Sequence, residues 1–280
     1  MAVFAGISDY FAQVAFQAGT YTSLMTEEGW EFDGNDCFYG ALLVDGASVS
    51  STRYFSKGTN YNVWGFADED CSDLDIKITN SDGTNVAQDN SVDKVPNCTF
   101  KPSSSGSYTI KVTNYDSRDN VIVFWGVMNN KESEFYNTGR KCANALGRAI
   151  TFFEYPDENL DSDGYHFPRN QVCMIGGIMP QGETQCFYNF SVDGNKECYF
   201  FGFGSEEVSD YDIKICQQEG NDIINTNYED NEYYLVGADN SEDAVAVVSG
   251  KLWDSYYYAL KYRNYKSSES GFVFNIILTE

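Results

Sequence analysis

The chain has few of the residues on which common enzyme sites depend. Its 280 residues include one histidine, His166. Serine and cysteine hydrolases need a histidine base beside the nucleophile, and we expect His166, which lies between Tyr165 and Phe167, to be a packing residue. The sequence also lacks a glycine-rich phosphate loop and an HExxH segment. It therefore predicts a protein that is not an enzyme.

Basic residues and long apolar runs are also scarce. Eighteen Lys and Arg stand against 42 Asp and Glu, which gives a net charge of -24. A protein that binds the phosphate backbone needs clustered basic residues, so no nucleic-acid partner is expected. No apolar run reaches the roughly 20 residues of a membrane span. Residues 1–5 lack the basic and apolar parts of a signal peptide, and none is expected there.

None of the eight cysteines forms a CxxC pair, which argues against a zinc site. An even number of cysteines is compatible with disulfides and equally with buried free thiols. If residues 197–204 and 210–217 form a hairpin, Cys198 and Cys216 face each other and become a candidate bridge.

The most abundant residues indicate a mainly β protein. The chain contains 21 Tyr, 20 Phe and 24 Gly, and aromatic segments separated by Gly, Asn and Asp are typical of short antiparallel strands. The strands expected in the first half are 38–44, 49–55, 60–67, 74–80, 85–88, 95–101, 107–114 and 121–128. Eight short strands predict a jelly-roll-like sandwich.

The sequence repeats itself. Residues 72–78 (SDLDIKI) recur 137 positions later as residues 209–215 (SDYDIKI), and the Tyr108 and Val121 strands recur 150 positions later. The second copy thus holds 13 extra residues, which we expect in a loop within residues 217–243. Each copy begins with an amphipathic segment, at 7–25 and about 132–153, that predicts a helix. The expected division is residues 1–130 and 131–280, each a helix followed by a sandwich.

One copy resembles a known family. The Gly65-Phe66 step, the 72–78 strand, the Asp82-Gly83 turn and the segment Ser105-Gly106-Ser107-Tyr108 are similar to the bacterial pre-peptidase C-terminal (PPC) domain. The likeness covers residues 50–128 well and 190–278 more weakly, and no protease domain is attached. Family members and the related collagen-binding modules are β-sandwiches attached to secreted enzymes. The resemblance therefore implies binding or accessory work outside the cell or on its surface.

Calcium is the cofactor that the resemblance implies. Some collagen-binding relatives hold Ca²⁺ between an acidic linker and acids near the Asp-x-Asp strand, and carboxylates are the ligands that Ca²⁺ prefers. Residues 159–164 also match the first half of an EF-hand loop, although Asn170 stands where its last glutamate belongs. The alternative is that Asp73 and Asp210 accept backbone hydrogen bonds in turns. The matching candidate ligands are Glu27, Glu28, Asp70 and Asp73 in the first copy and Asp157, Asp161, Asp163, Glu207 and Asp210 in the second.

Tyrosines of the last Tyr-rich strand are candidates for a ligand-binding face. They are Tyr256, Tyr258, Tyr262 and Tyr265. Exposed tyrosine suits a carbohydrate or protein partner, whereas buried tyrosine would only build the core.

Together these features predict a non-catalytic extracellular or cell-surface binding or adhesion protein, stabilised by calcium, with a matrix or surface protein or carbohydrate as partner. One alternative is a self-assembling filament, coat or matrix subunit, in which edge strands and helices join copies. Another is a glycan-active enzyme that uses two carboxylates. A cleft between the halves that gathers acidic side chains would favour the enzyme.

Overall fold

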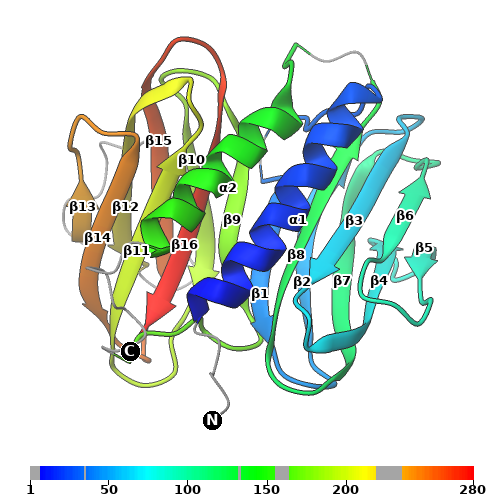
Figure 1. Cartoon of the computed structure of the whole chain (residues 1–280), viewed down its shortest axis with the longest axis horizontal. Coiled ribbons are helices and arrows are strands. Elements are labelled where there is room, and N and C mark those ends of the chain that lie inside the picture. Colours follow the sequence, from blue (N-terminus) through cyan, green and yellow to red (C-terminus); the bar gives the residue numbers. More distant parts are fainter. Residues whose placement is uncertain (1–6, 35, 132–133, 155–163, 219–234) are drawn as a thin grey trace.

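The structure, a computed structural model, describes residues 7–34, 36–131, 134–154, 164–218 and 235–280. Two helices, α1 (Ile7–Glu27) and α2 (Thr138–Glu154), run side by side over one face of a large sheet (Figure 1). Two smaller sheets pack against the opposite face. In the described part of the chain, neither helix is long and apolar enough to cross a membrane.

Within the described residues, eight strands follow each helix, as the sequence predicts for the first half. Those of the first half are β1 (Phe38–Leu43), β2 (Ser48–Phe55), β3 (Tyr61–Ala67), β4 (Cys71–Asn80), β5 (Asn85–Asp89), β6 (Asn97–Phe100), β7 (Gly106–Ser117) and β8 (Val121–Asn129). Those of the second half are β9 (Val172–Met179), β10 (Thr184–Phe190), β11 (Lys196–Gly204), β12 (Val208–Gln217), β13 (Leu235–Asp239), β14 (Val245–Leu252), β15 (Tyr258–Ser267) and β16 (Gly271–Thr279).

The strand order makes each half a jelly roll. The first half contributes β1-β8-β3-β6 to the large sheet and forms a four-stranded sheet in the order β2-β7-β4-β5. The second half contributes β9-β16-β11-β14 and forms β10-β15-β12-β13, which is the same arrangement. Eight antiparallel strands divided in this way between two packed sheets confirm the jelly-roll-like prediction. The matching orders also support the duplication read from the sequence.

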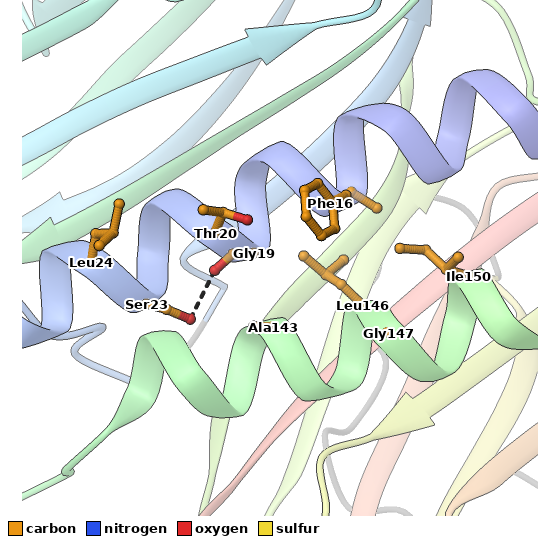
Figure 2. A pocket seen from close by; sticks show the side chains of 10 residues that line it. Phe16, Gly19, Thr20, Ser23, Leu24, Ala143, Leu146, Gly147 and Ile150 are labelled. Atoms are coloured by element: carbon orange, nitrogen blue, oxygen red, sulfur yellow. Dashed lines mark hydrogen bonds between the residues drawn. The ribbon is translucent and has the colours of Figure 1, made fainter.

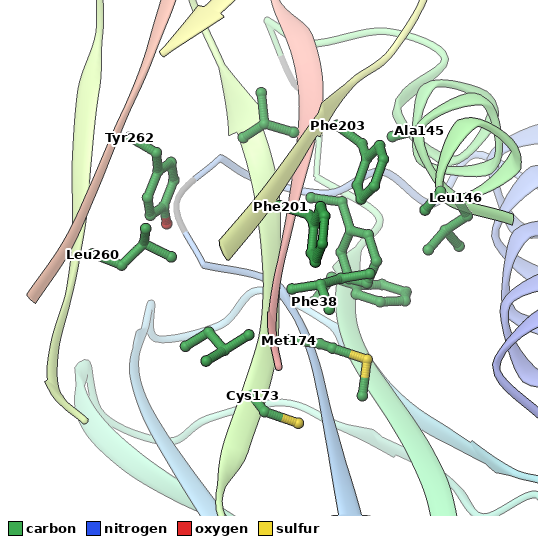
Figure 3. Close-up of a cluster of buried hydrophobic side chains, with 14 of the residues drawn as sticks. Phe38, Ala145, Leu146, Cys173, Met174, Phe201, Phe203, Leu260 and Tyr262 are labelled. Carbon is green, nitrogen blue, oxygen red and sulfur yellow. The ribbon is translucent and has the colours of Figure 1, made fainter. Parts of the chain in front are cut away.

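One continuous sheet joins the two halves. β1 pairs antiparallel with β9 at the centre, so the large sheet has eight strands and crosses the whole molecule. The aromatic core crosses the same junction. The Phe11 ring of α1 lies 5.8 Å from the Phe124 ring in the first half and 6.4 Å from the Phe274 ring in the second. Figure 3 shows part of this cluster, with Phe203 directed towards Ala145 of α2.

Hydrogen bonds lock the end of α1 to the start of α2. The Glu31 carboxylate accepts the Asn137 and Thr138 N–H groups, so a residue of the first half caps the helix of the second. The Thr26 hydroxyl accepts the Gly139 N–H at 3.0 Å. α2 begins at Thr138, later than the start near residue 132 that the sequence predicts.

The predicted hairpin of residues 197–204 and 210–217 is wrong. β11 belongs to the large sheet and β12 to a four-stranded sheet, so the chain crosses the sandwich between them and Cys198 does not face Cys216 in a ladder. All eight cysteines are free thiols. Burial raises the pKa of all eight, for example that of Cys198 to about 12, which disfavours the reactive thiolate.

The extra residues of the second copy fall in one connection. β4 and β5 are joined by a turn at Asp82-Gly83, where Gly83 has a φ of 77°. The corresponding connection from β12 to β13 spans Gln217 to Leu235, and residues 219–234 of it lie outside the described part. The insertion therefore leaves the registers of β13 to β16 unchanged.

Candidate functional site

A pocket of about 320 Å³ lies where the two halves meet, and we call it the junction pocket. α1, the turns before β4 and β8, and the segment before β9 all contribute to it. Its polar side chains include Asp68, Asp70, Asp119, Asn120 and His166. No three of the His, Cys, Asp and Glu side chains in the described ranges are placed to hold a metal ion.

Asp68 is the most buried acid of the pocket, with 1 % of its surface exposed. Its Oδ1 accepts the Asp70 N–H at 3.1 Å and its Oδ2 accepts the Ile122 N–H at 2.7 Å. Burial raises the pKa of Asp68 to about 6 in spite of these two bonds. Both carboxylate oxygens of Asp68 are therefore used to stabilise the backbone that forms the pocket wall.

Tyr10 forms another wall of the pocket. A hydrogen bond to the Asp70 carboxylate raises the pKa of Tyr10. Asp70 also forms an ion pair with Arg118, at 2.9 Å between Oδ1 and Nη2. Asp70 is thus already ion-paired, whereas no ion pair of Asp68 or Asp119 is found among the described residues. The Asp119 Oδ1 accepts the Asn120 N–H at 2.7 Å, which leaves its Oδ2 for a ligand.

His166 and Phe167 bring the second half into the pocket. The backbone of His166 exchanges two hydrogen bonds of 2.8 Å with Thr279, which fixes this segment beside β16. The Phe167 ring is buried and lies 6.2 Å from the Phe11 ring. His166 is therefore placed by packing, and its ring lines the pocket.

The structure separates the acids that were predicted to share calcium in the first copy. Asp70 lies beside Tyr10 near the start of α1, whereas Glu27 is the last residue of that helix and pairs with Arg140 at 2.9 Å. A helix rises about 1.5 Å per residue, so roughly 25 Å separates these two places. Glu27 and its neighbour Glu28 therefore cannot share an ion with Asp70.

Asp73 and Asp210 lie on the outer faces of the two small sheets. Asp73 is opposite Asp116 of β7, and both burial and the Asp116 charge raise the pKa of Asp73. Asp210 is opposite Lys266 instead, at the position that corresponds to Asp116. Glu207 accepts a hydrogen bond from Ser205 at 2.5 Å.

The remaining predicted ligands, Asp157, Asp161 and Asp163, lie outside the described residues. Calcium binding stays a prediction.

The predicted ligand-binding role is wrong for two of the four tyrosines. Tyr258 and Tyr262 have no exposed surface, and the Tyr262 hydroxyl donates to the Asp36 carboxylate at 2.6 Å. They belong to the core, so no ligand can stack on their rings. Tyr256 and Tyr265 are exposed, and the Arg263 guanidinium lies over the Tyr265 ring.

An apolar groove of about 380 Å³ lies between α1 and α2 (Figure 2), and we call it the helix groove. Gly19 lets the helices approach closely, because a Cβ there would lie 3.2 Å from the Ala143 Cα. Phe16 and Leu24 stand beside the groove and are 69 % and 56 % exposed. No charged side chain lines it.

No model of a known protein family matches the sequence, and no curated protein matches it. Among solved structures, the N-terminal CBM22-1-CBM22-2 tandem domain of Paenibacillus barcinonensis Xyn10C is 8 % identical, with 89 % of this chain and 98 % of that chain covered and a TM-score of 0.26. The PBSX exported protein XepA is 9 % identical, with coverages of 86 % and 84 % and a TM-score of 0.26.

The BSP domain of a biofilm associated protein is 11 % identical, with coverages of 86 % and 51 % and a TM-score of 0.27. These scores are too low to indicate a family or a function. The sandwich architecture rests on the strand pairing itself, and the PPC likeness stays a resemblance of motifs.

No local pattern in the sequence marks the junction pocket, since its residues lie far apart in the chain. One indirect signal was present. Asp68 and Ser205 are 137 positions apart and precede the repeated segment by equal distances. The acidic Asp68 of the first copy is thus replaced by the neutral Ser205 in the second, which indicates that the two halves differ at this position.

Proposed function

We propose that the protein is a non-catalytic binding protein of the cell surface or extracellular space, and that its ligand occupies the junction pocket. The observation that carries the proposal is the pocket itself. Acidic, amide and aromatic side chains from both halves converge there around a space of about 320 Å³. A concave site with a few convergent polar groups, one with a shifted pKa, is the usual form of a ligand site.

The arrangement of the acids supports binding over glycan hydrolysis, although the pocket does gather carboxylates between the halves. A glycosidase needs one carboxylic acid and one carboxylate directed at the scissile bond. Both Asp68 oxygens accept backbone N–H groups, and Asp70 is held by Arg118 and Tyr10. If Asp119 served as one catalytic carboxyl group, neither Asp68 nor Asp70 would thus be free to serve as the second.

An array of glycans and extracellular-matrix proteins tests the proposal. Asn120→Trp places a large side chain in the pocket and should lower binding at least tenfold. Ser270→Trp, at the corresponding position of the second half, is the matched control and should bind as the wild type does. Equal binding by both variants, or no binding of any ligand by the wild type, would refute the proposal. Release of reducing sugar from a bound glycan would instead favour the enzyme.

The helix groove favours a second candidate function, self-assembly. Apart from the buried Lys141, α1 carries two acidic residues and α2 carries two basic residues and one acidic residue, so the outer face of this layer has a net charge of only -1 in a chain of net charge -24. Two copies repel each other least through a neutral face. A twofold axis along the groove would place α1 of one copy over α2 of the other, so that opposite charges meet.

Light scattering after size-exclusion chromatography tests this candidate. Phe16→Glu should convert a dimer into a monomer, whereas Tyr115→Glu, an equally exposed aromatic on β7, should leave the dimer intact. A wild-type monomer at 100 µM would exclude self-assembly through this face.

A further inference from the structure

The junction pocket has a counterpart in the second half, related to it by the repeat. The Ile122 N–H donates to Asp68 at 2.7 Å, and the Phe272 N–H donates to the Ser205 hydroxyl at 3.0 Å. The backbone bond from Arg118 to Asp70 likewise matches the bond from Ser268 to Glu207, both 3.0 Å long. The same turns therefore surround both places.

A lysine fills the counterpart. Lys141 of α2 is 5 % exposed, and its Nζ donates to the Ser270 carbonyl oxygen at 2.7 Å. The Glu269 carboxylate lies 3.3 Å from the same Nζ. A buried ammonium group is stable only with such partners. This half of the molecule thus shows how the turn before the last strand holds an alkylammonium group.

In the first half the lysine is absent and its partners remain. Tyr10 occupies the position of Lys141, because Phe11, Val14 and Ala18 are buried as are the residues 131 positions later, Cys142, Ala145 and Ala149. Asp119 and Asn120 stand in the pocket where the second half has Glu269 and Ser270. The space that a lysine side chain would fill is open.

The charges around the pocket also favour a cation. Asp68 adds a carboxylate where the second half has the neutral Ser205, and Asp119 is not ion-paired in the described part of the chain. Three cations lie near the acids of the pocket. Arg118 is paired with Asp70, Lys94 donates to the Asp68 carbonyl oxygen at 3.3 Å, and Arg169 lines the pocket and is exposed to solvent. The rings of Tyr10 and Phe167 add aromatic surface, which attracts alkylammonium groups.

We propose that the junction pocket binds a primary alkylammonium group, which a lysine side chain of a protein partner or a free alkylamine would supply. Its carbon chain would lie against Tyr10 and Phe167, and its ammonium group would bind the Asp119 carboxylate and the Asn120 carbonyl oxygen. The inference rests on the proposed function, since it names the ligand of that same pocket.

Titration of the ¹⁵N-labelled protein with n-butylammonium chloride tests the proposal. The amide signals of Asn120 and Ile122 should shift in a saturable way. n-Butanol, which has the same chain without the charge, should give no saturable shift. Tyr10→Lys should abolish binding, because its own ammonium group would fill the pocket as Lys141 fills the counterpart. Asp119→Asn should weaken binding at least tenfold, and Asp82→Asn, which removes an exposed acid of the β4–β5 turn, should change it less than twofold.

A lysine peptide distinguishes the two sources. If Gly-Lys-Gly binds more tightly than n-butylammonium, the ligand is a protein lysine, and if it binds more weakly, the ligand is a free amine. The absence of shifts with n-butylammonium and with the peptide at 20 mM, or shifts that persist in Tyr10→Lys and Asp119→Asn, would overturn the inference. If a glycan then binds and Asn120→Trp prevents it, the proposed function survives without the ammonium ligand. If nothing binds, both fail.

Discussion

Asp68 makes the stability of the protein depend on pH in a direction that can be measured. Burial raises its pKa from 3.8 to about 6, so the folded state keeps the Asp68 proton at pH values where the unfolded chain has lost it. The contribution of Asp68 to stability is complete below pH 3.8 and is lost as the pH rises through 6. A difference of about two pH units corresponds to about 3 kcal/mol of unfolding free energy.

Asp68→Ser tests this value with the residue that the second half already uses. Ser205 shows that a hydroxyl there accepts the N–H of the following strand, so the variant loses one of the two hydrogen bonds of Asp68, a cost of about 1 kcal/mol. At pH 4 the variant should therefore be less stable than the wild type by about 1 kcal/mol. At pH 8 it should be more stable by about 2 kcal/mol, since it also escapes the cost of the buried charge.

Urea unfolding followed by tryptophan fluorescence at pH 4, 5, 6, 7 and 8 measures the difference. Comparison of variant and wild type removes the effect of the other acids, because both chains share them. Ser51→Ala is the control, because the buried Ser51 hydroxyl accepts the uncharged Trp125 indole N–H at 3.0 Å, and its loss of stability should be the same at every pH. A difference between Asp68→Ser and the wild type that does not change between pH 4 and pH 8 would refute the reasoning.

Three further perturbations test other parts of the structure. Asp89→Ala and Asp239→Ala should each lower the unfolding free energy by about 1–2 kcal/mol at pH 7. The Asn97 and Val247 backbone N–H groups bind these carboxylates and lower the pKa of both. Urea unfolding of the wild type should therefore show the loss of this contribution below pH 4. Gly139→Ala should lower the melting temperature by 10 °C or more, because a Cβ would overlap the carbonyl oxygen of Thr22, whereas Gly147→Ala has open space and should raise stability by up to about 1 kcal/mol. Asp73→Asn should raise the melting temperature in EDTA, because it removes the repulsion between Asp73 and Asp116 of β7. If calcium binds there, millimolar calcium should raise the melting temperature of the wild type and not that of the variant. No rise in the wild type would end the calcium hypothesis.

The sequence predicted the strands well because strand signals are local. Aromatic and β-branched residues alternate between turn residues, and that pattern determined the bounds of the first-half strands to within three residues. The partner of a strand is not local information. Residues 197–204 and 210–217 could form a hairpin or lie in opposite sheets with the same alternation, and only the jelly-roll order separates these cases.

The sequence contains a signal that Tyr258 and Tyr262 are buried and do not bind a ligand. They match Tyr108 and Val112 of the first copy, and the Tyr108, Ile110 and Val112 face is apolar throughout, as expected for a strand face directed at the core. The repeat thus indicated which face of the last Tyr-rich strand was buried. Residue type alone does not distinguish the two buried tyrosines from the two exposed ones.

The junction pocket shows why a duplicated fold need not have two equal sites. Glu31 and His166 occupy matching positions, since each exchanges two backbone hydrogen bonds with the end of a last strand, at Asn129 and Thr279. Glu31 is tied to the first turn of α2, and Lys141 of that helix fills the counterpart.

At the junction pocket, the residues at these two positions are His166 and Tyr10, and both line an open pocket. Changes at these two positions, together with Asp68 in the place of Ser205, thus distinguish the candidate site from the closed contact in its counterpart. The reciprocal substitution follows from this comparison: Lys141→Tyr should open the counterpart, leave Glu269 without its ammonium partner, and lower stability more at low salt than at high salt, because the lost ion pair is partly exposed. A loss of stability that is the same at both salt concentrations would mean that Lys141 acts through packing alone.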